Sequence, residues 1–525
     1  MRPAENAAFT AEPLRPVDNP PPPLPSSPLE YADATGAVDG LGGDALRRAM
    51  ALVIVAWMFG SVWMTATSGS PITLFAHHLR ASKFEFGLLA ALPFIASLVS
   101  MPASLVTERT GRRKAIFLWA LYIQRALWFA IAVVPVWIVS RYGFRVAQAA
   151  MVTFLVLLFV VHALNAIGGP AWVSWMADIV PDRVRGKYFS RRRQWGIVSA
   201  VPAALVVGLL LDRLAAPGAA AGPLTVLRWC AIIFMCAAVF GLADIALFQA
   251  VPEIRMKPQR EVSFGELLRK PLRNREFLWF AGFIATLTFA VSFMGQFVTL
   301  YLLERVGVSN TGVQLMLLVA PMLAQFLVLP VWGHAVDRMG KKPVLILSGL
   351  GLVPVGLGWC LMTSGSVWLG YALSAAGAAL WTGVEIANFN LVLEFSSTTD
   401  SAADDGGGSS YVAVNTAIIN IAGCAGGLAS GIIAQTLKDW SWQTTWMPWV
   451  KEFTFYELLF ALSGVLRLAA VVVFLPHIHE HDARPTREAL RFMTANIYNN
   501  LFNAVLQPVR FLRVKLRDSY VENEE

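Results

Sequence analysis

A few ionisable side chains lie inside long apolar stretches of this 525-residue sequence, where they could bind or release a proton or bind an ion. Glu385 is the best candidate for a carboxyl group that takes up a proton or binds a cation. His162 could titrate alongside it, because an imidazole changes charge near neutral pH. A charge at the bilayer centre costs at least about 2.5–3.5 kcal/mol on insertion scales, so each needs a reason to be there. The simpler alternatives are a structural or water-exposed carboxyl group for Glu385 and a packed core imidazole for His162.

Arg125 is a cationic side chain that also lies inside an apolar stretch, so its position needs an explanation too. It follows Lys114 by about eleven residues, which at about 1.5 Å per residue places it near the middle of a membrane-spanning helix. It could bind an anionic substrate, or it could neutralise Asp244 or another buried acid. Asp244 and Arg467 are expected to be structural or to lie near the inner mouth.

A short charged motif occurs twice, each time between two apolar runs. Each copy is a small residue, three spacers, an acid, an arginine, a spacer, a glycine and basic residues. The first copy comprises Ser104, Glu108, Arg109, Gly111, Arg112, Arg113 and Lys114, and the second Gly333, Asp337, Arg338, Gly340, Lys341 and Lys342. The small residue would let a neighbouring helix approach closely, and the glycine after the arginine suits a tight reversal. The motif could be a topological anchor only, or a conformational latch with a partner acid.

The elements that must position these residues are membrane helices. Hydrophobic residues make up 56% of the chain and charged residues 14%, with a mean hydropathy of +0.57, whereas soluble chains carry roughly 25% charged residues. Each spanning helix needs about 20 apolar residues. Twelve such runs cover residues 46–69, 84–106, 115–139, 147–173, 194–212, 226–250, 276–303, 312–332, 343–363, 366–393, 411–436 and 453–475. We therefore predict an all-α integral membrane protein with twelve transmembrane helices.

The twelve runs fall into two sets of six. We predict a disordered cytoplasmic tail (1–44), a six-helix bundle (45–250), a basic cytoplasmic linker (251–275), a second six-helix bundle (276–475) and a cytoplasmic amphipathic and basic tail (476–525). The C-terminal tail suits the anionic lipids of the inner leaflet, with a partner-binding helix as the alternative. The net charge of +8 comes largely from loops on one side, which is the positive-inside pattern and argues against a nucleic-acid partner. The acidic loop 394–410 departs from that pattern.

The six-plus-six layout and the two motif copies resemble the major facilitator superfamily (MFS), whose signature loop reads Gly-x-x-x-Asp-Arg-x-Gly followed by basic residues. The second copy matches it with lysines at the basic positions, whereas the first has Ser104 for the glycine and Glu108 for the aspartate. The resemblance spans nearly all of residues 46–475 and implies two pseudo-symmetric six-helix bundles. It also places Arg125 on a peripheral helix, which favours structural pairing.

The resemblance supplies partner acids for the motif. Residues 178–186 look like the family's acidic segment that ends in Arg-Gly, and Glu394 stands in the corresponding place of the second half. We expect Asp178 to pair with Arg109 or Arg112, and Glu394 with Arg338 or Lys341. Such latches would hold in the outward-open state and part as the halves rock, with the N-terminal latch the stronger. The predicted cytoplasmic gate comprises Glu108, Arg109, Gly111, Arg112, Asp178, Arg185, Gly333, Asp337, Arg338, Gly340, Lys341 and Glu394.

The resemblance further implies that the first, fourth, seventh and tenth helices line a central cavity. The candidates for substrate binding or coupling are Glu385, His162, Asn165, Gln296, Asn388, Arg125 and Trp381. Such a mixture of amides and indoles suits a neutral or mildly polar solute, such as a sugar or an amphipathic metabolite, and does not select between them. Elsewhere, Gly423, Gly427 and Gly431 have the spacing of close helix contact, and Pro202, Pro321 and Pro354 are expected to kink their helices.

The absent motifs narrow the function. The sequence has no Walker-type phosphate loop, no zinc-spaced cluster and no convincing Ser/His/Asp set, so we expect no cofactor, no metal and no enzymatic activity. We predict a monomeric secondary transporter in the cell membrane, both termini cytoplasmic, that moves a sugar or other polar metabolite by alternating access. Proton symport is one option. A multidrug or amphipathic-solute exporter and a non-transporting solute sensor are the alternatives.

Overall fold

The computed structural model describes residues 43–215, 222–253, 264–399, 407–443, 452–478, 480 and 487–488. By its contacts the chain forms two units, Met1–Arg48 and Ala49–Glu525, and the account below concerns the second. Twelve of its segments are helical, long and apolar enough to cross a membrane, which confirms the predicted number of spans. The predicted N-terminal tail up to residue 42, part of the linker and nearly all of the C-terminal tail lie outside the described residues.

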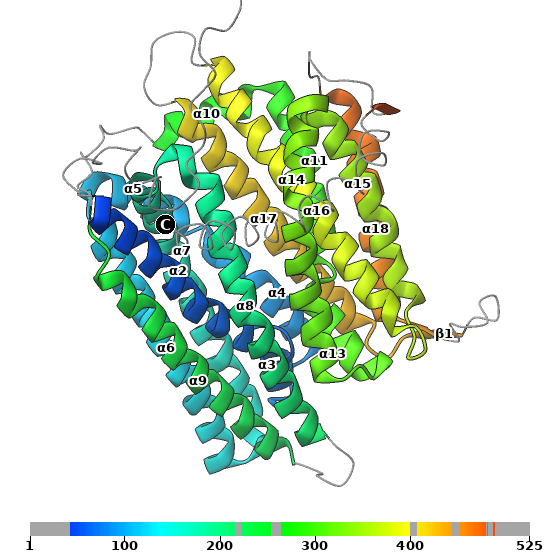
Figure 1. Ribbon diagram of the computed structural model, residues 1–525. Helices are drawn as coiled ribbons and strands as arrows, with labels where there is room; N and C mark the ends of the chain where they lie inside the picture. The colour runs from blue at the N-terminus through cyan, green and yellow to red at the C-terminus, as the bar shows by residue number, and fades with distance from the viewer. Residues whose placement is uncertain are drawn as a thin grey trace, which may run out of the picture. The chain divides into compact units, whose positions relative to one another are not determined.

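The first half of the chain supplies six of these spans (Figure 1). Its helices are α2 (Gly43–Ala66), α3 (Ser70–His78), α4 (Lys83–Ser97), α5 (Ser100–Thr110), α6 (Arg113–Tyr142), α7 (Ala147–Ile179), α8 (Asp182–Ala215) and α9 (Pro223–Gln249), with a 3-10 turn η1 (Phe144–Val146) before α7. The first span combines α2 with α3, and the second combines α4 with α5. Helix α10 (Phe264–Arg273) belongs to the linker between the halves.

The second half supplies the other six spans. Its helices are α11 (Arg275–Ser292), α12 (Gly295–Tyr301), α13 (Asn310–Gln314), α14 (Ala320–Met339), α15 (Lys341–Gly358), α16 (Val367–Thr399), α17 (Gly407–Thr436) and α18 (Phe455–Phe474). A short π segment, η2 (Leu302–Val306), extends α12, and another, η3 (Leu315–Val319), precedes α14. The 3-10 turn η4 (Trp359–Leu361) follows α15, and the 3-10 turn η5 (Leu475–His477) follows α18. Of the three prolines expected to kink helices, Pro321 is the second residue of α14, whereas Pro202 and Pro354 lie inside α8 and α15.

A small hairpin was not predicted. Strands β1 (Ser441–Gln443) and β2 (Glu452–Thr454) pair antiparallel, with Trp442 opposite Phe453. Arg305, at the end of the seventh span, donates a 2.6 Å hydrogen bond to Glu452 and thereby lowers the pKa of this partly exposed carboxyl group. The hairpin is thus tied to the bundle by an ion pair.

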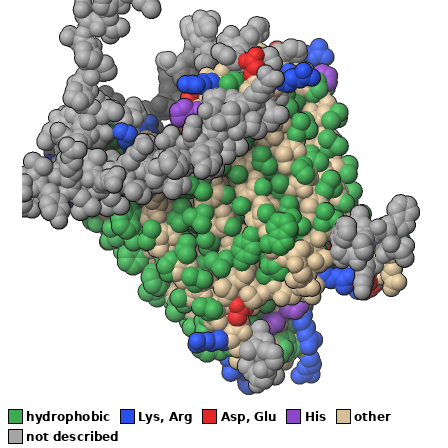
Figure 2. Space-filling model, turned by 45° about the vertical axis from the view of Figure 1, so that its right-hand side comes forward, with side chains coloured by type: hydrophobic (Ala, Val, Ile, Leu, Met, Phe, Trp, Pro, Cys, Tyr) green, Lys and Arg blue, Asp and Glu red, His purple; other side chains and the backbone are tan. Residues whose placement is uncertain are grey.

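Large apolar side chains form the outer surface of the helices. Trp119, Val206 and Trp368 are 60%, 66% and 70% exposed, and Figure 2 shows apolar side chains covering the middle of one face while charged side chains gather at its two ends. Because an apolar patch of this extent is rare on a soluble monomer, the belt marks the surface that meets lipid. The chain is therefore a multi-pass membrane protein.

Two spans break at glycines where the halves meet. Gly69, between α2 and α3, has φ 69°, and a Cβ there would lie 2.5 Å from Gln314 Oε1 of the other half. Gly295, between α11 and α12, has φ 26°, and a Cβ there would lie 2.8 Å from Ala90 Cβ. A side chain at either position would be strained by the backbone and crowded by the opposite half. Equivalent spans of the two halves thus bend at equivalent places.

The glycine series of the eleventh span packs against the second span. A Cβ on Gly423 would meet Phe94 at 2.4 Å, one on Gly427 would meet Ala91 N at 2.9 Å, and one on Gly431 would meet Gly87 Cα at 2.9 Å. The close helix contact predicted from this spacing is confirmed. It joins α4 to α17 and therefore one half to the other.

We predict that Gly87→Ala destabilises this contact. The added methyl would lie 2.3 Å from Gly431 Cα, and backbone cannot give way as a side-chain tip can. The expected cost is about 1–3 kcal/mol, measured as a lower thermal unfolding temperature of the purified protein. Gly169→Ala is the matched control, because no described atom lies within 4 Å of a Cβ there. Equal unfolding temperatures for the two variants would contradict the prediction.

Candidate functional site

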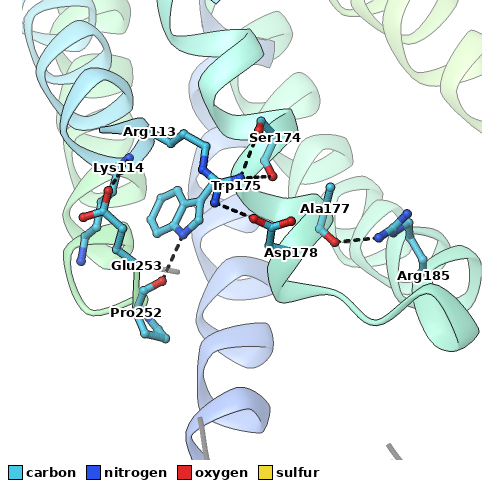
Figure 3. A network of polar contacts seen from close by, with 9 residues as sticks. All are labelled: Arg113, Lys114, Ser174, Trp175, Ala177, Asp178, Arg185, Pro252 and Glu253. Atoms are coloured by element: carbon cyan, nitrogen blue, oxygen red, sulfur yellow. Dashed lines mark hydrogen bonds and ion pairs between the residues drawn. The ribbon is translucent and has the colours of Figure 1, made fainter. Parts of the chain in front are cut away.

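The first motif loop presents one buried arginine. Helix α5 ends at Thr110, and Gly111 (φ 64°, ψ 3°) donates its N–H to Thr107 O at 2.9 Å. Helix α6 begins at Arg113, which is 2% exposed. Its guanidinium donates to the carbonyl O and Oγ of Ser174 at 2.9 and 3.1 Å and forms a 2.5 Å ion pair with Asp178 (Figure 3). The start of α6 is thereby bonded to the end of α7.

The partner of Asp178 therefore differs from the prediction. We expected Arg109 or Arg112, but the pair is made by Arg113. Arg112 is the N-cap residue of α6 and its side chain is exposed, as is that of Arg109, while Glu108 is half-buried. Because both Gly111 and Arg112 lie outside the helices, the first residue whose side chain turns inward is one position later.

Three helix ends join this pair in one network, which we call the motif-end cluster: Arg113, Lys114, Ser174, Trp175, Asp178, Pro252 and Glu253. Lys114 Nζ donates to the carbonyl oxygens of Gln249 and Val251, each at 2.7 Å, at the end of α9. Trp175 Nε1 donates to Pro252 O at 3.0 Å. Cationic donors suit these positions, because the last carbonyl groups of a helix lack intrahelical partners.

Arg185 has a related role at the neighbouring helix end. Its Nη2 donates to Ala177 O at 2.6 Å and to Val180 O at 3.3 Å (Figure 3). It therefore caps α7 from the first turns of α8. Of the predicted acidic segment, Asp178 bonds across to α6 while Arg185 stabilises the turn itself.

The second motif loop uses the same chemistry with a different turn. Gly340 (φ 94°, ψ 168°) is the only residue between α14 and α15, so Lys341 is the first residue of α15. Lys341 Nζ donates to Glu394 at 2.8 Å, which confirms one of the two contacts predicted for this acid. Glu480 accepts from the backbone N–H groups of Lys341 and Lys342 at 3.0 and 2.7 Å. Asp337 and Arg338 are exposed.

Glu480 was missed by the sequence analysis. It follows the twelfth span, as Glu253 follows the sixth, and Glu253 Oε1 lies 3.4 Å from the backbone N of Lys114. Each half thus brings an acid from just beyond its last helix to the start of its third helix, where helix N–H groups favour negative charge. The sequence signal that could have identified Glu480 is an acidic residue shortly after the last span of each half.

Gly333, the small residue of the second motif copy, does not make the close helix contact that we expected with any described residue. A Cβ placed on Gly333 would have no described heavy atom within 4 Å. The close helix approach expected at this glycine is therefore absent from the described residues in this conformation.

The two halves bond to each other at the opposite ends of the helices, which we call the far end. Asp212, near the end of α8, accepts from the backbone N–H groups of Asn310 and Thr311 at 2.6 and 3.0 Å. Thr73 Oγ1 donates to Gln296 Oε1 at 3.2 Å, which gives the predicted substrate candidate Gln296 a contact between the halves. The contact with Asp212 places a carboxylate at the start of α13, where the helix dipole stabilises it.

Glu304 contacts several residues at the far end. Its carboxylate lies 3.1 Å from His77 Nδ1 and 3.1 Å from Lys83 Nζ of the first half, and it accepts from the Tyr456 hydroxyl at 2.7 Å. The Glu304 side chain is only 31% exposed, so these ion pairs are partly shielded from water. The sequence analysis did not identify this residue.

Most of the other substrate candidates lie in separate places. Glu385 accepts from Trp381 Nε1 at 2.8 Å on α16. Asn388 Oδ1 accepts from Asn415 Nδ2 at 3.2 Å, between α16 and α17. His162 is half-buried and Asn165 exposed on α7. The structure therefore brings together Glu385 with Trp381 but forms no single bonded cluster of these candidates among the described residues.

Arg125 is a buried structural arginine by its contacts. It is 5% exposed, as is Asp244, and Nη2 donates to Asp244 Oδ2 at 3.1 Å. Its guanidinium carbon lies 3.4 Å from the centre of the Trp63 ring. The predicted neutralisation of Asp244 is confirmed, and these contacts favour a structural role over substrate binding. Arg467 is likewise buried, and donates to Leu352 O at 2.8 Å.

We predict that Asp178→Asn lowers stability by about 1–2 kcal/mol. A hydrogen bond to a charged group contributes about 1.5–3 kcal/mol, reduced here because the carboxylate is half-exposed. Thermal unfolding of the purified protein measures the loss. Arg112→Gln removes an exposed charge from the same loop and should change stability by less than about 0.5 kcal/mol. A larger effect for Arg112→Gln than for Asp178→Asn would contradict the assignment of Arg113 as the buried partner.

Comparison with known proteins agrees with this arrangement. The family model described as Major Facilitator Superfamily matches residues 52–431. A search of curated proteins finds no significant match. Among solved structures, the nucleoside transporter NupG is similar at 13% identity with a TM-score of 0.52, covering 83% of this chain and 99% of that one.

Two further structures share the fold. A bacterial homologue of the iron transporter ferroportin in the inward-facing state has 14% identity and a TM-score of 0.59, covering 83% of this chain and 99% of that one. A D-xylose-proton symporter has 16% identity and a TM-score of 0.54, covering 82% and 98%. At these identities the likeness establishes the fold, while the family match covers most of the sequence. The chain belongs to the Major Facilitator Superfamily.

Proposed function

We propose that this protein is a secondary transporter that moves a small solute across the cell membrane by alternating access. In this proposal the motif end is cytoplasmic, the far end faces outside, both termini are inside, and the chain acts as a monomer. The distribution of polar contacts is the observation that best supports it. Among the contacts given for the described residues, the ion pairs of the motif end lie within one half, whereas the bonds between halves lie at the far end or, for Arg193 with Gln325, near mid-helix.

This distribution suits two rigid bodies that rock. The motif-end cluster ties α6, α7 and α9 together, and Lys341 with Glu394 and Glu480 ties α15 and α16 to the end of the second half. Each half can therefore move as one body. Opening the far end would break contacts such as those of Glu304, and a Cβ on Gly333 at the motif end now has no described atom within 4 Å, which leaves room for a closer helix contact there.

The motif-end pairs need a different role from that of outward-open latches. We expected them to part as the halves rock, yet both are formed while the far-end contacts are also formed. Because each pair joins helices of one half, rocking of one half against the other need not break it. In our proposal they keep each half rigid throughout the cycle, and Glu304 with its partners acts as the far-end gate.

The solute in our proposal is a sugar or another polar metabolite, taken up as a proton symporter with Glu385 as the coupling carboxyl group. Its hydrogen bond from Trp381 holds the carboxyl group in a defined position, and Arg193 lies on the opposite half. The similar D-xylose-proton symporter supports proton-coupled transport as a function of this fold.

The competing functions are export of amphipathic solutes and solute sensing without transport. Deletion of residues 1–42 and 489–525 separates a transporter from a sensor. A transporter should move solute with or without these residues, whereas a sensor should move none in either form.

We predict that Glu385→Gln uncouples uptake from the proton gradient. A thermal-shift screen of solutes identifies a ligand, and uptake of that ligand into liposomes is then measured with and without a pH gradient. The native protein should be stimulated several-fold by the gradient, and Glu385→Gln should lose that stimulation while retaining solute exchange, because Gln cannot carry the proton. Glu276→Gln, which alters an exposed carboxyl group on α11, is the control. Stimulation that survives in Glu385→Gln would exclude this carboxyl group as the coupling site.

We predict that Glu304→Gln opens the far end. The substitution preserves shape but removes the charge that pairs with Lys83 and His77. In a variant without native cysteines, Thr73→Cys reports on the far end, because Thr73 is now 1% exposed and bonded to Gln296. Glu304→Gln should raise the rate at which a membrane-impermeant maleimide modifies this cysteine several-fold. Asp439→Asn, which changes a far-end carboxylate that is 88% exposed, should not. No difference between the two would rule out Glu304 as a gate.

A further inference from the structure

An arginine is held between two tryptophan rings where the halves of the molecule approach each other. The guanidinium carbon of Arg192, on α8, lies 4.2 Å from the centre of the Trp57 ring on α2 and 4.8 Å from that of Trp172 on α7. Both distances fall within the roughly 6 Å range of cation–π attraction. Two indole rings therefore hold this guanidinium from two different helices.

Arg192 differs from the other inward-facing arginines in its hydrogen bonding. Arg113 and Arg125 pair with carboxylates, and Arg185 and Arg467 donate to backbone carbonyl groups. Within the described part of the chain, Arg192 has no hydrogen bond or ion pair, whereas its buried Nε lacks an acceptor as do those of the other four arginines. A guanidinium carries five N–H donors in a fixed plane, and leaving a buried donor of a charged group unpaired is energetically costly. The two indole rings attract the cation but accept no conventional hydrogen bond from its N–H groups.

The surroundings show that this position is built into the fold. One turn after Arg192, a Cβ on Gly196 would lie 2.1 Å from Trp57 Nε1, so only glycine lets the indole lie against α8 here. The next residue, Arg193, reaches across to Gln325 of the second half. The site therefore lies beside the meeting of the halves, and the side chains of Arg192, Trp57 and Trp172 are half-buried rather than fully enclosed.

We propose that Arg192, framed by Trp57 and Trp172, binds the carboxylate or phosphate group of the transported solute. This inference rests on the proposed transport function and narrows its polar metabolite to an organic anion. A planar guanidinium presents paired N–H groups that match two oxygens of a carboxylate or phosphate. Because the two rings hold the guanidinium in place before binding, little side-chain entropy is lost when the anion arrives. The low dielectric beside two indoles further strengthens a charge-assisted bond.

Three related solutes test this proposal on the purified full-length protein. Gluconate carries a carboxylate, glucose 6-phosphate a phosphate, and glucose neither. Binding is followed by thermal shift and by quenching of tryptophan fluorescence, which Trp57 and Trp172 contribute. We expect at least one of the two anions to bind at least tenfold more tightly than glucose, and the arm that binds distinguishes carboxylate from phosphate recognition. Failure of both anions to bind more tightly than glucose would overturn the proposal.

Substitutions then locate the bound group. Arg192→Gln should weaken binding of the anion at least tenfold, and Arg192→Lys should weaken it less, because it keeps the charge but loses the planar donor edge. Arg191→Gln removes the adjacent exposed arginine and should leave affinity unchanged. Unfolding temperatures of the ligand-free variants check that Arg192→Gln is folded, and Arg192→Lys serves in its place if it is not. Unchanged anion affinity in the folded Arg192 variant would overturn the proposal.

Failure of this inference is distinguishable from failure of the proposed function. If liposomes containing the protein take up glucose but neither anion, transport stands and the anion site is wrong. If an anion binds through Arg192 but is never moved across the liposome membrane, the site stands and transport is wrong.

Discussion

The pairing of Arg113 with Asp178 is the interaction on which the arrangement of the first half depends. It brings a buried cation at the start of α6 to a carboxylate at the end of α7, and the adjacent Lys114 bonds to the end of α9. A charged group at the edge of a bilayer must find either water or a partner. Here the partners are helix ends, whose unsatisfied carbonyl and N–H groups would otherwise need water as well. One cluster therefore satisfies both requirements and joins three spans of the same half.

The second half also pairs a cation at the start of its third helix, but the loop before that helix is one residue shorter. At the first loop Gly111 is left-handed and Arg112 lies between helices, whereas at the second loop Gly340, with ψ 168°, is the only linking residue. The inward-facing cation is consequently the second basic residue after the glycine in one half and the first in the other. Similar variation occurs deeper in the membrane, where the first half pairs Arg125 with Asp244 and the second bonds Arg467 to a backbone carbonyl group. Pseudo-symmetry thus preserves which helices are joined, but not which residues join them.

This variation explains how far the sequence could predict the site. The twelve spans, the glycine contact of the eleventh span and the pairing of Lys341 with Glu394 follow from composition, spacing and motif, and the structure contains all three. The choice of Arg113 over Arg112 depends on the ψ angle of a glycine, which the identity of glycine does not reveal. Glu304 could not be predicted because its partners come from residues more than 150 positions away on each side, and nothing in its own neighbourhood marks them.

The two ends of the molecule also differ in what kind of contact can be broken. At the far end, α4 and α17 meet through glycines, so their contact depends on close approach and disappears as soon as the helices separate, because dispersion forces fall steeply with distance. The polar contacts there, such as those of Glu304, are partly exposed and can exchange their partners for water at modest cost. The motif end instead buries its arginine, and parting that pair would leave a charge without a partner. A molecule that moves as two bodies would be expected to place its costly contacts within each body and its inexpensive ones between them, and the contacts named above for the described residues follow this distribution.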